Sequence, residues 1–365
     1  MELAATAVDG AVPAARGTIP FKFTATGAEY FRIWIVNLLL TLVTLGIYSA
    51  WAKVRRLRYF YGNTSLADSA FEYHGQPIQI LKGRLIAAAA LIVYSATTHF
   101  WPLSIFVFAP LLAFAIPWVI VRSRKFQMQV TSWRNLRFRF HGTYGGAFAA
   151  YIGWAIVAVI TLYIMLPHLL YKRVKFLLSE TSFGGQRLRF EKTVGPYYKL
   201  YYVTLLIGLG MMVAAVIVMA VIGGIIGGIS GLSGMAGPSP KSVGSVLLSL
   251  VMSGVFALLF LPIVAMFERK FLNENFDGLR IGPHTVRCRL QTGRLAQIYV
   301  TNLLGMIFTL GLFYPWARVR RMQYQFESMS LETVGSLDGF VADADKAQSA
   351  TGEELGEFFD VDFGF

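Results

Sequence analysis

Residues 33–75 read IWIVNLLLTLVTLGIYSAWAKVRRLRYFYGNTSLADSAFEYHG, and this stretch contains every part of a unit that returns along the chain. An uncharged apolar segment covers 33–52, and basic residues follow within 53–58. A Thr-Ser pair at 64–65 then precedes the short run Phe71-Glu-Tyr73. An apolar segment of this length predicts a helix, whereas alternation with a period of two predicts a strand.

The parts of this unit recur at fixed offsets. Thr64-Ser65 returns 67 positions later as Thr131-Ser132, and a further 50 positions later as Thr181-Ser182. Trp51-Ala-Lys-Val-Arg-Arg56 returns after 265 positions as Trp316-Ala-Arg-Val-Arg-Arg321. Such repetition indicates a chain built from similar supersecondary units. We expect units near 21–75, 76–142, 143–192, 193–290 and 291–335, between a flexible N-terminus over 1–20 and an acidic C-terminal tail over 336–365.

The charges are arranged as in a membrane protein. Of the 365 residues, 55% are hydrophobic and 15% are charged, against about 25% charged in ordinary soluble domains. As a helix, about 20 apolar residues span a hydrocarbon core of about 30 Å. The stretches without Asp, Glu, Lys or Arg are 33–52, 85–121, 140–171, 200–240, 242–267 and 295–317. We therefore predict a polytopic α-helical membrane protein with internal repeats of helical segment, basic turn and short strand. It should contain about seven hydrophobic helices, with short β-strands at the membrane face.

The positions of Lys and Arg predict how the chain crosses the membrane, because positive charge marks the cytoplasmic side. Basic clusters flank 85–121 and 200–267, and each of these reads as a helical hairpin that starts and ends in the cytoplasm. A single crossing by 140–171 would export the bases that follow it, so a re-entrant course is favoured there. Single crossings are expected for 33–52 and 295–317. A re-entrant course of the three short stretches would bend near Gly46, Gly145-Gly146 and Gly311.

Several motifs resemble those of the YjgN family of uncharacterised bacterial inner-membrane proteins. They are Phe21-x-Phe23-x-x-x-Gly27-x-x-Tyr30-Phe31, Thr44-Leu-Gly-Ile-Tyr48, Trp51-Ala52, Asn63-Thr64 and Thr181-Ser-Phe-Gly-Gly-Gln-Arg187-Leu-Arg-Phe190. The resemblance covers roughly residues 20–335. It implies a multi-pass protein of the bacterial inner (cytoplasmic) membrane, with basic loops and C-terminal tail in the cytoplasm. The family has no catalytic residues to carry over, so the resemblance implies no reaction.

The basic clusters next to tryptophans are candidate contacts with lipid headgroups and the membrane interface. These residues are Trp51, Arg55, Arg56, Trp118, Arg122, Arg124, Lys125, Trp316, Arg320 and Arg321. Anionic headgroups attract such bases by about 1 kcal/mol each, and tryptophan prefers the interface. The net charge of +13 is therefore assigned to membrane lipids and not to nucleic acid. A protein partner and the oligomeric state are left undetermined.

Polar and small residues inside the helical segments are further candidates, and the polar ones have two interpretations. Asn37 and Asn302 occupy equivalent positions and are a possible polar lining of a permeation path. The alternative is an ordinary interhelical hydrogen bond. Gly223, Gly227 and Gly231 recur at every fourth position, which predicts one smooth face for helix packing.

No motif for catalysis, metal binding or a cofactor is expected. His74 and His141 occur at equivalent Phe-x-aromatic-His-Gly positions, without a third ligand, and read as strand-end turns. Cys288 is the only cysteine. Motifs with paired carboxylates, HExxH or GxSxG are missing, and no uncharged stretch carries an intramembrane carboxylate. We therefore predict that the protein is not an enzyme.

Two functions are compatible with these patterns. The first is passive or lipid-handling transport of a small molecule through a groove between the units, favoured by the repetition and by Asn37 and Asn302. The second is a membrane scaffold or adaptor whose cytoplasmic strands and acidic tail bind a protein partner. The transport function is the first choice of the two.

Overall fold

The strands of the chain meet in one closed antiparallel barrel. The computed structural model describes residues 16–232 and 243–344. In the described part the strand order around the barrel is β1-β10-β9-β8-β7-β6-β5-β4-β3-β2. The strands are β1 (Arg16–Phe23), β2 (Thr64–Leu66), β3 (Ser69–Tyr73), β4 (Thr131–Trp133), β5 (Leu136–Phe140), β6 (Thr181–Phe183), β7 (Gln186–Arg189), β8 (Leu279–Ile281), β9 (His284–Cys288) and β10 (Met329–Val334). The half of β1 over Arg16–Pro20 pairs with β10, and its half over Phe21–Phe23 pairs with β2, so β1 closes the ring.

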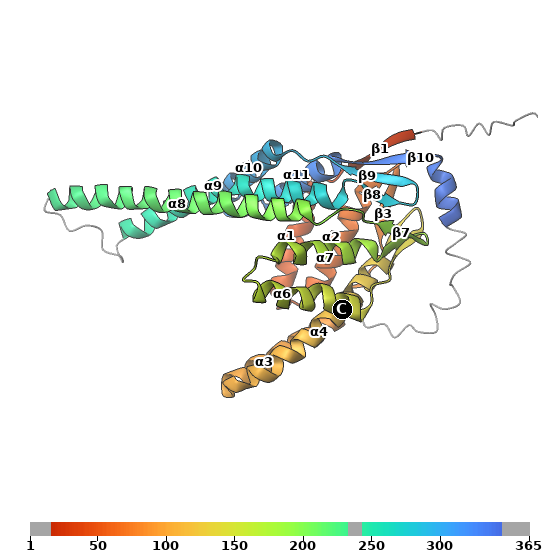
Figure 1. Cartoon of the computed structure of the whole chain (residues 1–365), viewed down its shortest axis with the longest axis horizontal. Helices are drawn as coiled ribbons and strands as arrows, with labels where there is room; N and C mark the ends of the chain where they lie inside the picture. The colour runs from red at the N-terminus through yellow and green to blue at the C-terminus, as the bar shows by residue number, and fades with distance from the viewer. Residues whose placement is uncertain (1–15, 233–242, 345–365) are drawn as a thin grey trace, which may run out of the picture.

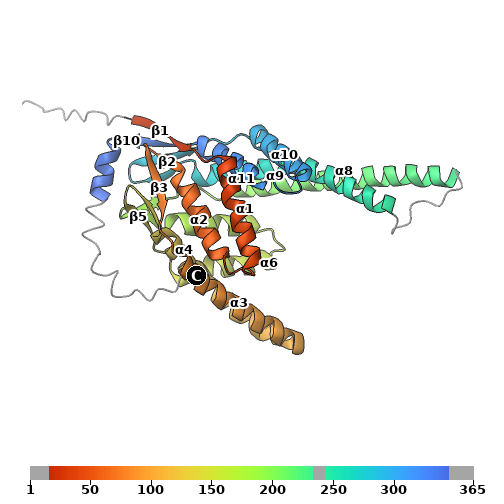
Figure 2. The ribbon, with the colours of Figure 1, turned by 180° about the vertical axis from the view of Figure 1, so that it is seen from behind.

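Helices connect successive strand pairs, and they extend from one end of the barrel (Figures 1 and 2). The long pairs α3–α4 and α8–α9 reach furthest from it. The helices are α1 (Gly27–Val43), α2 (Ser49–Gly62), α3 (Pro77–Phe100), η1 (Pro102–Ser104), α4 (Ile105–Gln129), α5 (Tyr144–Phe148), η2 (Ala149–Gly153), α6 (Trp154–Ile160), α7 (Leu166–Ser179), α8 (Gly195–Leu232), α9 (Val243–Phe276), α10 (Thr292–Phe308) and α11 (Tyr314–Glu327).

Two-residue turns join the strands within each pair. The turns Ala67-Asp68, Arg134-Asn135 and Gly184-Gly185 have positive φ at both positions. This backbone matches the right-handed twist of a hairpin, and Asn, Asp and Gly adopt it most readily. The repeated Thr-Ser pairs begin the first strand of three of these hairpins, as Thr131 and Ser132 do in β4.

Apolar side chains fill the inside of the barrel. Trp133, Leu136 and Phe183 are at most 4% exposed, and they belong to one cluster with residues of the seven other strands. The Trp133 ring lies 5.8 Å from that of Phe183 and 6.2 Å from that of Phe71. Because such side chains are packed across the lumen, the barrel is a core and not a water-filled passage.

The predicted α-helical fold with about seven hydrophobic helices is wrong. The described residues contain three helices that are long and apolar enough to cross a membrane, Pro77–Phe100, Pro102–Gln129 and Gly195–Ile222. The strands are not accessory pieces, since together they form a closed barrel. Closure depends on partners as distant in sequence as Arg16 and Val334, and no local pattern reports such a pairing.

The single crossings expected for 33–52 and 295–317 are also wrong. Each short stretch is a helical hairpin: α1 and α2 are joined by a turn over 44–48, and α10 and α11 by a turn over 309–313. The strands on either side of each hairpin lie in the same barrel, so the chain returns to where it started. The stretch 140–171 does the same, but it turns at 161–165, whereas Gly145 and Gly146 lie within α5.

Candidate interaction surfaces of the barrel and the helical hairpins

A threonine closes the backbone of each short helical hairpin at its turn. In the α10–α11 turn the Thr309 hydroxyl donates to the Gly305 carbonyl at 2.7 Å and accepts from the Phe313 N–H at 2.9 Å. The Gly311 N–H donates to the Met306 carbonyl at 2.7 Å, which caps the end of α10. These bonds satisfy backbone groups that would otherwise be costly in a lipid environment.

The other two turns use the same bonds. Thr44 donates to the Leu40 carbonyl at 2.7 Å and accepts from the Tyr48 N–H at 2.9 Å. Thr161 donates to the Val157 carbonyl at 2.8 Å, and the Met165 N–H donates to Thr161 at 3.3 Å. A Thr-Leu pair therefore opens every one of these turns, including the α6–α7 turn, where Tyr163 stands in place of glycine at φ 65°.

The tips of these hairpins carry strongly exposed apolar side chains. Leu45 and Leu310 are 94% exposed and Leu162 is 84% exposed. An exposed leucine of this kind is unfavourable in water and favourable in hydrocarbon, by about 1.5–3 kcal/mol per side chain. Exposed apolar tips of this kind mark candidate surfaces for interaction.

Replacing Thr309 with valine is expected to destabilise the α10–α11 turn by about 1–3 kcal/mol, because the Phe313 N–H loses its acceptor while the side-chain shape is kept. Hydrogen exchange of the amides over 309–316 in detergent micelles measures this. Thr301→Val is the matched control, since Thr301 donates to the Gln297 carbonyl and accepts from no backbone N–H in the described part. Equal exchange in the two variants would contradict a specific role of Thr309.

The predicted headgroup and interface residues all lie on the second helices of three hairpins, α2, α4 and α11. Arg55 and Arg56 are exposed, and Trp118 is 43% exposed. Trp316 has a different environment. Its side chain extends from α11 towards α1, with its ring 5.0 Å from that of Phe31. The half-buried members of the predicted set are Trp51, Arg122, Arg124, Lys125 and Arg321.

Trp316 also limits what can stand at Gly27. A Cβ at Gly27 would lie 2.2 Å from the Trp316 ring, so this close helix contact requires glycine. The tryptophan therefore packs the first hairpin against the last one, and this contact helps to close the ring of helices.

The two asparagines do not share one environment. Asn302 donates through Nδ2 to the Ala317 carbonyl at 3.1 Å and accepts from Arg320 Nη1 at 3.2 Å, which links α10 to α11. Asn37 is 8% exposed, and its Oδ1 has no partner in the described part of the chain. The contacts of Asn302 are those of an interhelical hydrogen bond. Gly223, Gly227 and Gly231 lie on α8, but their packing falls outside the described side chains.

A buried carboxylate that the sequence reasoning missed lies beside the last basic cluster. The Glu268 side chain is 14% exposed, and its Oε1 accepts from Arg321 at 2.6 Å and from Gln325 at 2.7 Å. This charged hydrogen-bond pair joins α9 to α11. The only sequence signal is an acid at the start of the basic run Glu268-Arg-Lys270.

The two repeat-equivalent histidines join neighbouring hairpins of the barrel. His74 follows β3 and contacts the Ser132 hydroxyl on β4 through Nε2 at 2.7 Å. His141 follows β5 and contacts the Ser182 hydroxyl on β6 at 2.8 Å. Each histidine therefore has the strand-end position that its motif indicates. No group of three or more metal-ligating side chains occurs among the residues searched, which are those that the structure describes.

A short helix over 337–344 covers the end of the barrel remote from the other helices (Figures 1 and 2). Phe340 lies edge-on to the His284 ring at 4.8 Å, and Ala344 is 4% exposed against Gly184. Arg134 Nη1 lies 2.5 Å from Asp338 Oδ1. The first residues of the predicted acidic tail thus form a cap on the barrel, whereas residues 345–365 lie outside the described part.

The cap covers a buried histidine. His284 is 1% exposed; its Nδ1 accepts from the Val334 N–H at 3.3 Å, and its Nε2 has no partner in the described part. Burial lowers the pKa of His284 below its ordinary value. The capped state therefore favours the neutral form of the His284 ring. In an opened state the pKa of this ring returns to its ordinary value of about 6.5.

Lowering the pH below about 6.5 is expected to open the cap, because the opened state then binds the additional proton. The capped state keeps its full stability above that pH, and the opened fraction should rise by at most about tenfold per pH unit as the pH falls. The rate of proteolysis within 337–344 measures it. A His284→Gln variant should show no such dependence; the same pH profile in that variant would exclude His284 as the cause.

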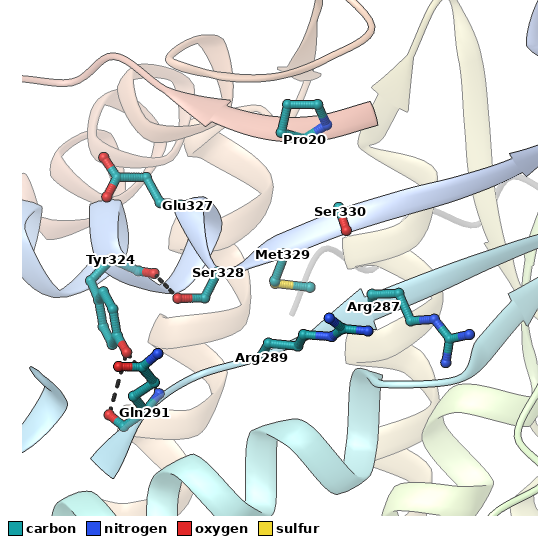
Figure 3. A pocket seen from close by; sticks show the side chains of 9 residues that line it. All are labelled: Pro20, Arg287, Arg289, Gln291, Tyr324, Glu327, Ser328, Met329 and Ser330. Atoms are coloured by element: carbon teal, nitrogen blue, oxygen red, sulfur yellow. Dashed lines mark hydrogen bonds between the residues drawn. The ribbon is translucent and has the colours of Figure 1, made fainter. Parts of the chain in front are cut away.

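A pocket of about 380 Å³ lies where β9, β10 and α11 meet (Figure 3). Arg287 on β9 and Arg289, which directly follows β9, line it, as Figure 3 shows. Arg287 is held by Glu332, with Nε 2.9 Å from Oε1, whereas Arg289 is exposed and forms no ion pair in the described part. The pocket therefore offers one free guanidinium at the junction of helices and strands.

The comparisons with known proteins agree with the membrane architecture. The family of bacterial proteins of unknown function DUF898 matches residues 18–358. This chain belongs to that family. Proteins named "Inner membrane protein YjgN" are similar to it, which confirms the predicted relation to the YjgN family. The protein from Salmonella typhimurium is 33% identical over 145 residues, or 40% of this chain and 37% of the relative.

The match to the protein from Escherichia coli K12 is shorter, with 31% identity over 127 residues, or 33% of this chain and 31% of the relative. The chain thus matches well under half the length of these curated relatives. No solved structure matches it. The names of the relatives support location in a bacterial inner membrane, so the chain is a membrane protein of this family.

Proposed function

We propose that the protein is a non-enzymatic membrane scaffold whose barrel stands at the cytoplasmic face of the inner membrane and binds a protein partner. The observation that carries this proposal is the gathering of all described strands in one apolar-filled barrel, with the helices at one end. Such a body has two free surfaces, its wall and its capped end. Cys288 is 3% exposed, and burial raises its pKa to about 11, which makes it a poor nucleophile.

The topology that follows combines two kinds of hairpin. The α3–α4 and α8–α9 pairs are proposed to cross the membrane and return. The three short hairpins are proposed to enter one leaflet, because their second helices reach a base after four to six residues, or about 6–9 Å of helix. The first bases after the turns are Lys53, Lys172 and Arg318. With all barrel-proximal bases on one side, the positive-inside rule assigns that side to the cytoplasm.

The strand registers support the proposal of five repeated units. In the first four a helical hairpin is followed by a strand hairpin, and in the fifth it is followed by β10, which pairs with β1. Ser132 pairs with Arg137 in β4–β5, and Ser182 pairs with Arg187 in β6–β7. The Tyr59 hydroxyl accepts from the Thr26 N–H at 3.0 Å, and the Tyr324 hydroxyl accepts from the Gln291 N–H at 2.7 Å. Tyr59 and Tyr324 stand at equivalent positions of the first and last units, and so do Thr26 and Gln291.

Lipid-handling transport is the second candidate, and the exposed hairpin tips favour it. Helices shorter than the hydrocarbon thickness make the bilayer thinner around them, which lowers the barrier to movement of a headgroup between leaflets. The asparagines lend it less support than expected, because Asn302 is already engaged by Ala317 and Arg320.

Photo-crosslinking in cells separates the two candidates. A crosslinker at Thr18 or Ala70, both exposed on the barrel wall, should give discrete protein adducts. At Ile92, which is 68% exposed on α3, it should give lipid adducts only. Lipid exchange between leaflets of reconstituted vesicles is expected to equal that of protein-free vesicles. Faster exchange, without protein adducts from the wall, would overturn the scaffold in favour of lipid handling.

A further inference from the structure

Arginines are concentrated on the outer wall of the barrel over three neighbouring hairpins. Outward positions on β5, β7 and β8 carry Arg137, Arg139, Arg187, Arg189 and Arg280, which we call the arginine wall. Their neighbours in sequence, such as Leu136 and Leu188, are buried inside the barrel. The alternation of a strand therefore directs these arginines outward.

Acidic side chains of the described residues neutralise little of this wall. Arg187 lies 3.5 Å from Glu180, and Arg280 lies 3.5 Å from Glu191; both are exposed pairs of the weak kind. Arg137, Arg139 and Arg189 form no ion pair within the described part of the chain.

Arg189 is in addition directly opposite Arg280 across the β7–β8 ladder, where like charges are unfavourable. Within the described residues the wall therefore carries more positive charge than its acidic neighbours balance, and any acidic group that reaches it lowers the repulsion between these two strands.

The C-terminal segment begins beside this wall. Ala344 packs against Gly184 in the β6–β7 turn, and β7 starts two residues later, at Gln186. Residues 345–365 contain six acids and one lysine: Asp345, Glu353, Glu354, Glu357, Asp360, Asp362 and Lys346. Roughly 20 residues can extend about 66 Å, while the wall is only three strand spacings, or about 15 Å, across.

We propose that residues 345–365 dock on the arginine wall of their own barrel. Carboxylates of the segment pair with Arg137, Arg139 and Arg189, and the phenylalanines at its end pack on the arginine side chains. The tether at Ala344 keeps the segment at a high effective concentration, so each contact can be weak. The docked segment shields the wall from other anions, whether an acidic protein or lipid headgroups. This inference does not depend on the scaffold role.

The test uses the full chain in nanodiscs of phosphatidylcholine, with and without phosphatidylglycerol. In one variant the five acids of 353–362 are replaced by their amides, which frees the wall. A fluorescent peptide of sequence 345–365 is then titrated against each protein, and its anisotropy is measured. We expect the amide variant to bind the peptide at least about tenfold more tightly than the native chain, since the native wall is occupied in cis.

Charge reversal locates the site. Arg139→Glu with Arg189→Glu, made in the amide variant, should weaken peptide binding by about tenfold or more. Arg16→Glu with Lys22→Glu is the matched control, because β1 lies opposite β6 in the ten-strand ring and this pair should leave binding unchanged. A peptide with lysines in place of its acids should bind the Arg139→Glu, Arg189→Glu protein, which shows that the reversed wall is still folded.

Three results would overturn the proposal. The first is equal peptide binding by the native chain and the amide variant, or none by either. The second is binding that survives reversal of the wall. The third is binding that is present in phosphatidylcholine nanodiscs and disappears with phosphatidylglycerol, since headgroups would then be the occupants of the wall in a membrane.

Discussion

Replacing Trp133 with alanine is expected to cost about 3–5 kcal/mol of barrel stability, the largest single loss that the described contacts predict. Trp133 is 4% exposed, its ring contacts those of Phe71 and Phe183, and its Nε1 donates to the Ser69 carbonyl at 3.1 Å. Alanine leaves a cavity in the middle of the cluster that the described strands share. Hydrogen exchange of β4 and β5 amides, measured on the protein in micelles, should rise accordingly.

Trp118→Ala is the control for this change. It removes the same side chain from α4, where it is 43% exposed, and surface substitutions of this kind usually change stability by less than about 1 kcal/mol. Strand amides that exchange equally slowly in both variants would mean that Trp133 is not central to the core.

Cysteines placed on β1, β3 and β7 are expected to be protected alike from a membrane-impermeant thiol reagent in intact cells. The positions are Thr18, Ala70 and Gln186, all exposed, in a Cys288→Ser background. One closed barrel requires all three on one side of the membrane, and the proposed topology has that side in the cytoplasm. The effect is all-or-none, because a reagent that does not cross the membrane labels no cytoplasmic site.

The arrangement with seven spans makes the opposite prediction for two of these positions. Single crossings at 33–52 and 140–171 would export Thr18 and Gln186 while keeping Ala70 inside. Phe100→Cys supplies the positive control, since Phe100 is 85% exposed at the α3–α4 turn, on the proposed outer side. Labelling of Thr18→Cys or Gln186→Cys in intact cells would contradict the barrel topology.

Local structural features could be predicted from the sequence because they depend on neighbouring residues. The alternation over Leu136–Phe140 predicts a strand, and β5 has those bounds. The Thr-Leu-Gly motifs at Thr44 and Thr309 mark the turns of two hairpins. The third turn was missed because Tyr163, and not a glycine, adopts the positive φ there. Its signal was the Thr161-Leu162 pair, which aligns with the other two.

The contacts of the candidate interface residues could be predicted from the sequence only in part. The bases and tryptophans were expected in basic turns that follow the apolar helices. The structure places them on the helices α2, α4 and α11 instead, with Arg55 and Arg56 in the middle of α2. Their partners were not predictable: Arg321 meets Glu268 from another hairpin, and Trp316 meets Gly27 from the opposite end of the chain. Such contacts depend on which helices become neighbours.

The sequence by itself determined that the chain is built from charge-free apolar segments, basic clusters and short strands, because hydrophobicity and periodicity are properties of adjacent residues. Only the tertiary structure decided that the strands close into one barrel and that the short segments turn back. A strand of three residues such as β2 has no stability of its own and acquires its place from its partners. The same holds for the cap: Phe340 and Ala344 are part of an acidic tail in sequence, and become part of a core because the end of the barrel is open to them.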